Sequence, residues 1–203
     1  MRGDSATGSV LRAAAMLGGA ALATTTVMQW LRVRRAMRRA GAGVCVGGAS
    51  ARAYESHPDR PQASILVLGD STGVGLGATH PEHSIAGQLG TEHPNARIVN
   101  RAAIGARFED IPRQLAEARR DAGVRRFDVI VLLVGANDVL HLTPLHRLEA
   151  QARAVLPVLA RSGSRVVWLC CGNIGLAPIF VPPWSWLASA RTRRVCELFE
   201  RLA

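Results

Sequence analysis

Short apolar runs alternate with longer amphipathic segments from residue 64 to the end of the chain. The apolar runs are rich in Val, Ile and Leu, which is typical of buried strands; they span residues 64–69, 97–102, 128–135 and 165–171. The other segments carry apolar residues at helical spacing; they span residues 84–93, 108–120, 144–161 and 184–202. This alternation predicts an α/β fold: a doubly wound, mainly parallel sheet with helices on both faces.

The first 40 residues follow a different pattern. Residues 13–31 carry no charge and are followed at once by RVRRAMRR, with five Arg in eight positions. An uncharged stretch beside a basic cluster is typical of a membrane anchor, and the positive-inside rule would leave the following residues on the cytoplasmic side. We therefore expect membrane association through a hydrophobic helix in residues 13–39. Two alternatives stay open: a cleaved signal peptide with its site at residues 21–23, leading to export, and a basic helix in solution or on a surface.

The segment between these two parts lacks apolar periodicity. Residues 41–62 are rich in Gly, Ser and Pro, which predicts a linker. The chain therefore divides into an N-terminal helix at 1–40, a linker at 41–62 and a folded domain at 63–203. A length of 203 residues fits one ordinary domain with a tail.

The charge of the chain is concentrated outside the predicted domain. All 25 basic residues are Arg, the formal net charge is +10, and residues 1–60 hold nine Arg against three acids. Aromatic residues make up only 4% and are not interleaved with the Arg residues, so the stacking surface of a single-strand binder is absent. We expect no nucleic-acid partner.

Neither a metal nor a nucleotide cofactor is expected. The four cysteines have no C-x-x-C pair and no regular spacing, which argues against a zinc site and against a disulfide framework; they are Cys45, Cys170, Cys171 and Cys196. Cys170 and Cys171 end an apolar run and are interpreted as small buried apolar residues. The glycine-rich stretch at 69–77 contains no Lys and does not fit a phosphate-binding loop.

Small and polar residues follow three of the four predicted strands. GDSTG (69–73) follows the first strand, Gly105 lies a few residues after the second, and GAND (135–138) follows the third. Because ligands of such sheets bind at the carboxyl ends of the strands, we expect these groups to converge. A serine at a strand-to-helix turn can act as a nucleophile, and backbone N–H groups with an Asn amide can form an oxyanion hole.

At these residues the sequence resembles the GDSL, or SGNH, hydrolase family. The matching blocks are GDSTGVGLGA at 69–78, the glycine of RAAIGAR at 101–107 and GANDVLHLTPLHRL at 135–148, and the resemblance covers about residues 64–203. It implies a flavodoxin-like α/β fold and a serine hydrolase that cleaves an ester or thioester through a covalent acyl-enzyme, without a cofactor. The substrate would be a small-molecule, lipid or carbohydrate ester.

The resemblance also assigns roles to single residues. Ser71 would be the nucleophile, and its own N–H, the N–H of Gly105 and the side chain of Asn137 would form the oxyanion hole. Asp70 and Asp138 would support the site, with Asp138 capping a helix or bracing the Asn137 loop. Ser71 and its neighbour Thr72 can also serve as a helix N-cap.

One block of the family has no counterpart here. The family carries a C-terminal Asp-x-x-His that supplies the general base, yet no His follows His146, and a further strand and helix are also lacking. Two hypotheses fit: a truncated product of a longer gene, or a natural pseudoenzyme whose pocket binds an acyl or acetyl ligand without turnover. Asp138 and His141 have the same spacing, but this His directly follows the Asn137 block, and it becomes the candidate base only if no other exists. The run at 165–171 should form an open apolar edge.

Overall fold

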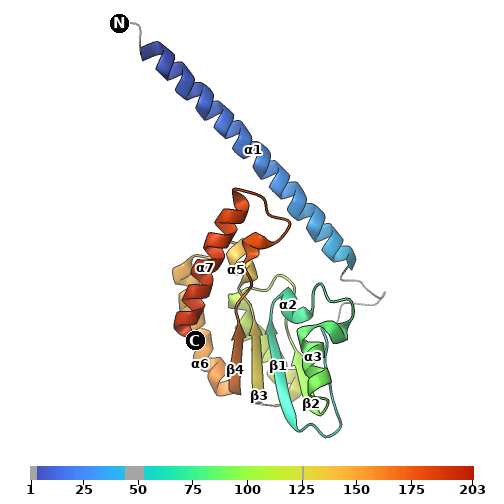
Figure 1. The fold of residues 1–203 in the computed structure, drawn as a ribbon. Helices are drawn as coiled ribbons and strands as arrows, with labels where there is room; N and C mark the ends of the chain where they lie inside the picture. The colour runs from blue at the N-terminus through green and yellow to red at the C-terminus, as the bar shows by residue number, and fades with distance from the viewer. Residues whose placement is uncertain (1–3, 44–52, 125) are drawn as a thin grey trace.

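A four-stranded parallel sheet lies at the centre of the computed structural model, which describes residues 4–43, 53–124 and 126–203 (Figure 1). The strands have the order β2-β1-β3-β4; they are β1 (Ala63–Gly69), β2 (Ala96–Asn100), β3 (Phe127–Leu133) and β4 (Gly163–Leu169). The parallel α/β prediction is confirmed. The last three strands each end two residues earlier than predicted.

Helices cover both faces of the sheet (Figure 1). One face packs against α4 (Ile111–Ala122), α6 (Leu145–Ser162) and α7 (Trp184–Leu202). The other face packs against α3 (Ile85–Glu92). The sequence pattern did not predict the shortest helices: α2 (Ser71–Val74), α5 (Ala136–Leu140) and the 3-10 turns η1 (Pro81–His83), η2 (Phe108–Asp110) and η3 (Ile174–Leu176).

Alternate residues of the central strand β1 belong to two separate hydrophobic cores. Leu66 and Leu68 belong to the larger core, under α4, α6 and α7, whereas Ile65 and Val67 belong to the smaller one, beside α3. Because side chains of a strand alternate between the faces of a sheet, a run in which every residue is apolar is what two covered faces require. Three aromatic rings meet in the larger core with centroids 4.2 to 5.6 Å apart; they are Phe108, Trp168 and Phe199.

Part of the predicted linker belongs to the domain instead. Ser56 forms an antiparallel bridge with Ile98 of β2, through hydrogen bonds of 2.8 and 3.1 Å, and Tyr54 packs against the smaller core. Glu55 accepts a hydrogen bond from the Asn100 N–H. The structure therefore differs from the predicted boundary at residue 63 for residues 54–56. Residues 44–52 of the predicted linker, and Cys45 with them, lie outside the described residues.

The N-terminal helix α1 (Asp4–Gly43) extends well beyond the domain (Figure 1). It touches the domain through Gln29, whose side chain donates to the Ile179 carbonyl at 3.1 Å and accepts from the Val181 N–H at 3.0 Å. Most of the apolar side chains described on this helix are exposed, Leu17 by 73% for example. Within the described residues, no helix combines the length and hydropathy that crossing a membrane requires. The expected membrane anchor at residues 13–39 therefore finds no support.

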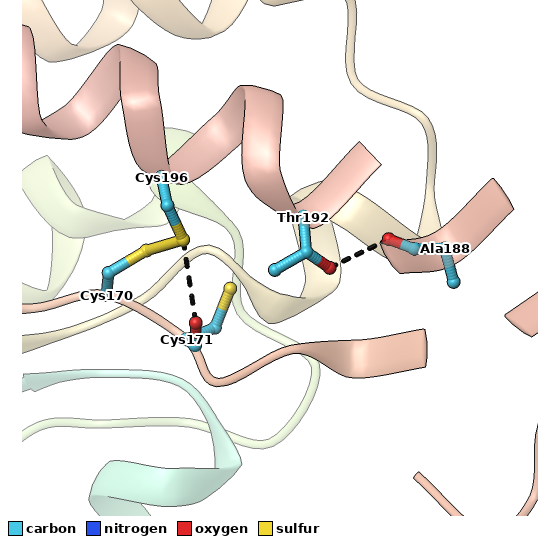
Figure 2. Close-up of a disulfide and its surroundings, with 5 residues drawn as sticks. All are labelled: Cys170, Cys171, Ala188, Thr192 and Cys196. Carbon is cyan, nitrogen blue, oxygen red and sulfur yellow. Dashed lines mark hydrogen bonds between the residues drawn. A yellow bond between two sulfur atoms is a disulfide. The ribbon is translucent and has the colours of Figure 1, made fainter. Parts of the chain in front are cut away.

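A disulfide joins Cys170, just beyond β4, to Cys196 of α7 (Figure 2). The expectation that the cysteines form no disulfide is wrong for this pair, and Cys170 is exposed rather than buried. The two residues are 26 positions apart, and only the packing of α7 beside the end of β4 brings them together. Sequence spacing carries no signal for such a contact.

Reduction of this disulfide is expected to lower the free energy of unfolding by about 3 kcal/mol, because an open chain gains loop entropy when it unfolds. Urea denaturation with and without a reductant measures the change. Cys171→Ser is the matched control, since Cys171 is a free thiol next to the bridge and its loss should leave the difference intact. Equal midpoints with and without the reductant would show that the bridge does not contribute.

The fourth strand is the open edge that the sequence predicted. Among the described strands, β4 pairs only with β3. Two side chains on one of its faces remain exposed, Val167 by 39% and Leu169 by 44%. An apolar edge of this kind is a known hazard for association between chains.

Candidate active site

The first strand turns sharply into a helix at Gly69. This glycine has φ +141°, a conformation that side-chain-bearing residues rarely adopt, and the Asp70 N–H donates to the Leu133 carbonyl of β3 at 2.8 Å. Asp70 is the N-cap of α2, because its carboxylate accepts from the Thr72 N–H at 2.9 Å. The cap is thus neither Ser71 nor Thr72. Ser71 is the first residue of α2 and is half-buried.

The second strand leads into a turn that contains Gly105. The Ala103 N–H of this turn donates to the Gly69 carbonyl at 3.0 Å, so the turn lies against the end of β1. Gly105 has φ +80°, is exposed, and has open space around its Cα. Its backbone is therefore accessible from solvent.

The third strand ends at Leu133, and α5 begins three residues later at Ala136, with Gly135 as its N-cap. Asn137, in the first turn of α5, donates from its side-chain amide to the Ala106 carbonyl at 3.0 Å. Asp138 accepts from the Phe108 N–H at 3.0 Å and from the Thr143 hydroxyl at 2.9 Å. Asp138 thus connects the start of α5 to the Phe108 and Thr143 segments.

These hydrogen bonds join all three segments at the carboxyl edge of the sheet. Gly69 is bonded to the Gly105 turn, that turn to Asn137, and Asp70 to the end of β3. The three segments that carry the predicted residues are therefore held together at this edge. The N–H of Ser71 opens a helix and has no intrahelical acceptor, which leaves it available to a ligand.

Burial changes the acidity of both supporting carboxyl groups. Burial raises the pKa of Asp138 above its ordinary value, although hydrogen bonds from Phe108 and Thr143 act in the opposite direction. Burial likewise raises the pKa of Asp70, against the hydrogen bonds from Thr72. Both carboxyl groups therefore resist ionisation more than an exposed aspartate does.

Asp138→Asn is expected to gain stability relative to the unmodified protein as the pH rises from about 4 to 7. A folded-state pKa above the unfolded one means that the carboxyl stabilises the fold below the unfolded pKa and loses this contribution as the pH rises through the folded pKa. An asparagine can accept from the Phe108 N–H through its one amide oxygen and donate its NH2 group to the Thr143 hydroxyl, and it does not titrate. Urea denaturation of both proteins at pH 4 and pH 7 measures the difference. A pH-independent difference would contradict the assignment.

A small cavity of about 140 Å³ opens at the carboxyl ends of β1, β3 and β4. Its lining includes Asp70 and Thr72, the two neighbours of Ser71, together with Leu133 and Cys171. Figure 2 shows that the Cys171 side chain stands apart from the disulfide, and burial raises the pKa of this thiol to about 11. Cys171 is thus a neutral thiol at physiological pH and a poor nucleophile.

The histidines do not complete a triad in this structure. His141 caps the end of α5, where its ring Nδ1 lies 2.8 Å from the Asn137 carbonyl oxygen. Among the described residues, which include every histidine of the chain, none makes a hydrogen bond to the Ser71 hydroxyl.

Two buried amide side chains that support the site were missed in the sequence. Gln114 is fully buried and forms a pair of 2.8 Å hydrogen bonds, one with the N–H and one with the carbonyl of Gly69. Asn100 donates to the Gly73 carbonyl at 2.8 Å. A signal existed for Gln114, because it lies within the apolar face that Ile111, Leu115 and Ala118 form on α4.

A parallel α/β domain with a serine on the turn after its first strand, and with glycine and asparagine at the neighbouring strand ends, has the architecture of a hydrolase. The profile of the GDSL-like lipase/acylhydrolase family matches residues 67–203. The chain therefore belongs to this family of ester hydrolases, which confirms the resemblance found in the sequence.

Two solved structures show the same fold at low sequence identity, and a third is similar to a lesser degree. A lipolytic G-D-S-L protein from Veillonella parvula is 13% identical with a TM-score of 0.52, over 68% of this chain and 73% of that one. The acetyl xylan esterase AlAXEase is 18% identical with a TM-score of 0.50, again over 68% and 73%. The acetyl xylan esterase Axe2 variant from Geobacillus stearothermophilus is 16% identical with a TM-score of 0.48, over 70% and 74%. No curated protein sequence matches the chain significantly.

Proposed function

We propose that this protein hydrolyses an ester by way of an acyl-enzyme on Ser71. The observation that carries the proposal is the chain of hydrogen bonds from Gly69 through the Gly105 turn to Asn137, which joins the three family blocks. A nucleophile and its oxyanion donors have to be held in fixed positions to lower a reaction barrier.

In the proposed reaction, the Ser71 hydroxyl attacks the acyl carbonyl carbon and the alcohol leaves. The N–H groups of Ser71 and Gly105 and the second amide hydrogen of Asn137 stabilise the oxyanion. Water then cleaves the acyl-enzyme and releases the acid. The proton of the Ser71 hydroxyl ends on the leaving alcohol.

The cavity that Asp70 and Thr72 line favours a short acyl group, and Ser71 lies between these two residues in the sequence but is not itself part of the lining. The volume of this cavity, about 140 Å³, is well below the roughly 300 Å³ at which pockets for drug-sized ligands begin. Acetyl esters fit a space of this size, and the similarity to an acetyl xylan esterase agrees with them. We therefore propose an acetylated small molecule or carbohydrate as substrate.

Labelling with a fluorophosphonate tests the proposal directly. An activated serine should take up one phosphonate per chain, and peptide mass spectrometry should locate it on Ser71. The release of p-nitrophenol from p-nitrophenyl acetate provides the second readout. The unlabelled protein should catalyse this release, and the labelled protein should not. Absence of labelling across pH 6 to 9 would rule out the hydrolase for this chain.

A binding module is the second candidate. It is favoured by the observation that no histidine hydrogen-bonds Ser71 in the described part of the chain. An unactivated serine is a weak nucleophile, so such a protein would hold an acetylated ligand without cleaving it. Saturable binding of acetylated xylo-oligosaccharides, without labelling and without release of acetate, would favour this function.

A further inference from the structure

An apolar groove of about 530 Å³ lies between α1 and the domain, where α5 and α7 form its walls. Val33 of α1 forms part of one wall, Leu140 and Leu142 at the end of α5 form another, and Leu187 of α7 forms a third. Leu142 and Leu187 are 70% and 58% exposed, so this apolar surface has no cover among the described residues. The volume is in the range of small-molecule sites.

The position of α1 along this groove is fixed by a polar contact. Gln29 also lines the groove, is only 8% exposed and uses both ends of its amide on the backbone of residues 179 and 181. Its hydrogen-bonding groups are therefore engaged by the protein itself and are not offered to a ligand.

The other polar side chains of the groove are all hydrogen-bond donors. Arg191 and Arg194 lie one turn apart along α7, and Trp184 stands at the start of this helix. Arg191 donates from one terminal nitrogen to the Thr143 carbonyl, whereas Arg194 is exposed. Among the described residues, the other terminal nitrogen of Arg191 and both of Arg194 make no hydrogen bond, so the two guanidinium groups can donate to an acceptor in the groove.

The positive charge of the groove also favours a ligand that accepts hydrogen bonds. Neither arginine forms an ion pair with a carboxylate among the described residues. Burial lowers the pKa of Arg191, the nearby positive charge of Arg194 lowers it further, and the charge of Asp138 acts in the opposite direction. An anion placed between the two guanidinium groups would relieve this repulsion.

We propose that the groove binds an alkyl carboxylate, with the chain along the apolar walls and the carboxylate at Arg191 and Arg194. A guanidinium presents a planar fork of donors that matches a carboxylate, and the uncovered apolar surface matches an alkyl chain. The site contains none of Ser71, Gly105 and Asn137. The groove lies next to the proposed hydrolase site, since α5 also carries Asn137, but the proposed binding goes beyond hydrolysis and does not depend on it.

Calorimetric titration of the full chain with octanoate and with 1-octanol separates the two halves of this ligand. We expect octanoate to bind about tenfold more tightly than octanol, since a charge-assisted pair adds to the same burial of the chain. Arg194→Gln should remove about this tenfold difference. Arg193→Gln is the matched control, because Arg193 is its exposed neighbour on the same helix and does not line the groove.

A second variant tests the apolar half. Ala188→Trp places a large side chain in the groove and should weaken both ligands about tenfold or more. Ser71→Ala should bind octanoate unchanged, so a failure of the hydrolase proposal leaves this one testable. Equal affinity for octanoate and octanol, equal behaviour of the Arg193 and Arg194 variants, or binding of octyl phosphate without octanoate would each overturn the proposal. Circular dichroism of each variant confirms that the fold is retained.

Discussion

Ser71→Ala is expected to abolish fluorophosphonate labelling and to lower kcat/KM for p-nitrophenyl acetate about a thousandfold or more, because the acyl-enzyme can no longer form. The change should cost little stability. Alanine is a good helix former at the first position of α2, and the hydroxyl makes no hydrogen bond to another described residue. A loss of activity would then reflect chemistry rather than unfolding.

Ser164→Ala is the control for this substitution. Ser164 is an exposed serine at the opposite end of the sheet, near the start of β4. It should label and turn over like the unmodified protein, with the same urea midpoint. Labelling that persists in Ser71→Ala would place the reactive group elsewhere in the chain.

Gly69→Ala is expected to cause the largest loss of stability of any single alanine substitution at the site. A Cβ at this position would lie 1.9 Å from the Leu133 carbonyl oxygen and 2.5 Å from its carbon, and φ is +141°. Both neighbours are backbone atoms of an adjacent strand, so relief requires β1 and β3 to separate where Asp70 bonds to Leu133. We expect the free energy of unfolding to fall by more than about 4 kcal/mol, or the chain to fail to accumulate in soluble form.

Gly77→Ala is the control that separates two effects of Gly69→Ala: the steric clash of the added Cβ with Leu133 and the cost of a positive φ. Gly77 also has a positive φ, +94°, but no atom lies within 4 Å of an added Cβ. Only the conformational penalty remains, about 1 to 2 kcal/mol. Urea denaturation followed by far-ultraviolet circular dichroism compares the two variants. Similar stabilities would show that β1 and β3 tolerate the added carbon.

The sheet and the strand-end residues could be predicted because their signals are local. A run such as ILVLG is buried on both faces, and a parallel sheet requires that pattern. The convergence of Ser71, Gly105 and Asn137 followed from the rule that strand ends share one edge. The family match agrees with that inference, whereas the catalytic roles of these residues stay predictions.

The features that escaped prediction depend on contacts between distant segments. The Cys170–Cys196 bridge needs α7 to lie beside the end of β4, and Gln114 reaches Gly69 across 45 positions of the sequence. Gln29 contacts residues about 150 positions away. No periodicity encodes pairs of this kind.

The cytoplasmic location and the membrane association stay predictions as well.

The Gln29 contact lies near the middle of α1, so a rotation of the helix about this contact moves its N-terminal end over a large distance. With a rise of about 1.5 Å per residue, the segment from Gln29 to Asp4 is roughly 38 Å long. A tilt of about 10° at this contact would displace the end of the segment by some 6 to 7 Å. A small movement of the loop at residues 179–181 would therefore cause a larger displacement of the N-terminal end of α1. A spin label or fluorophore near that end would measure this displacement.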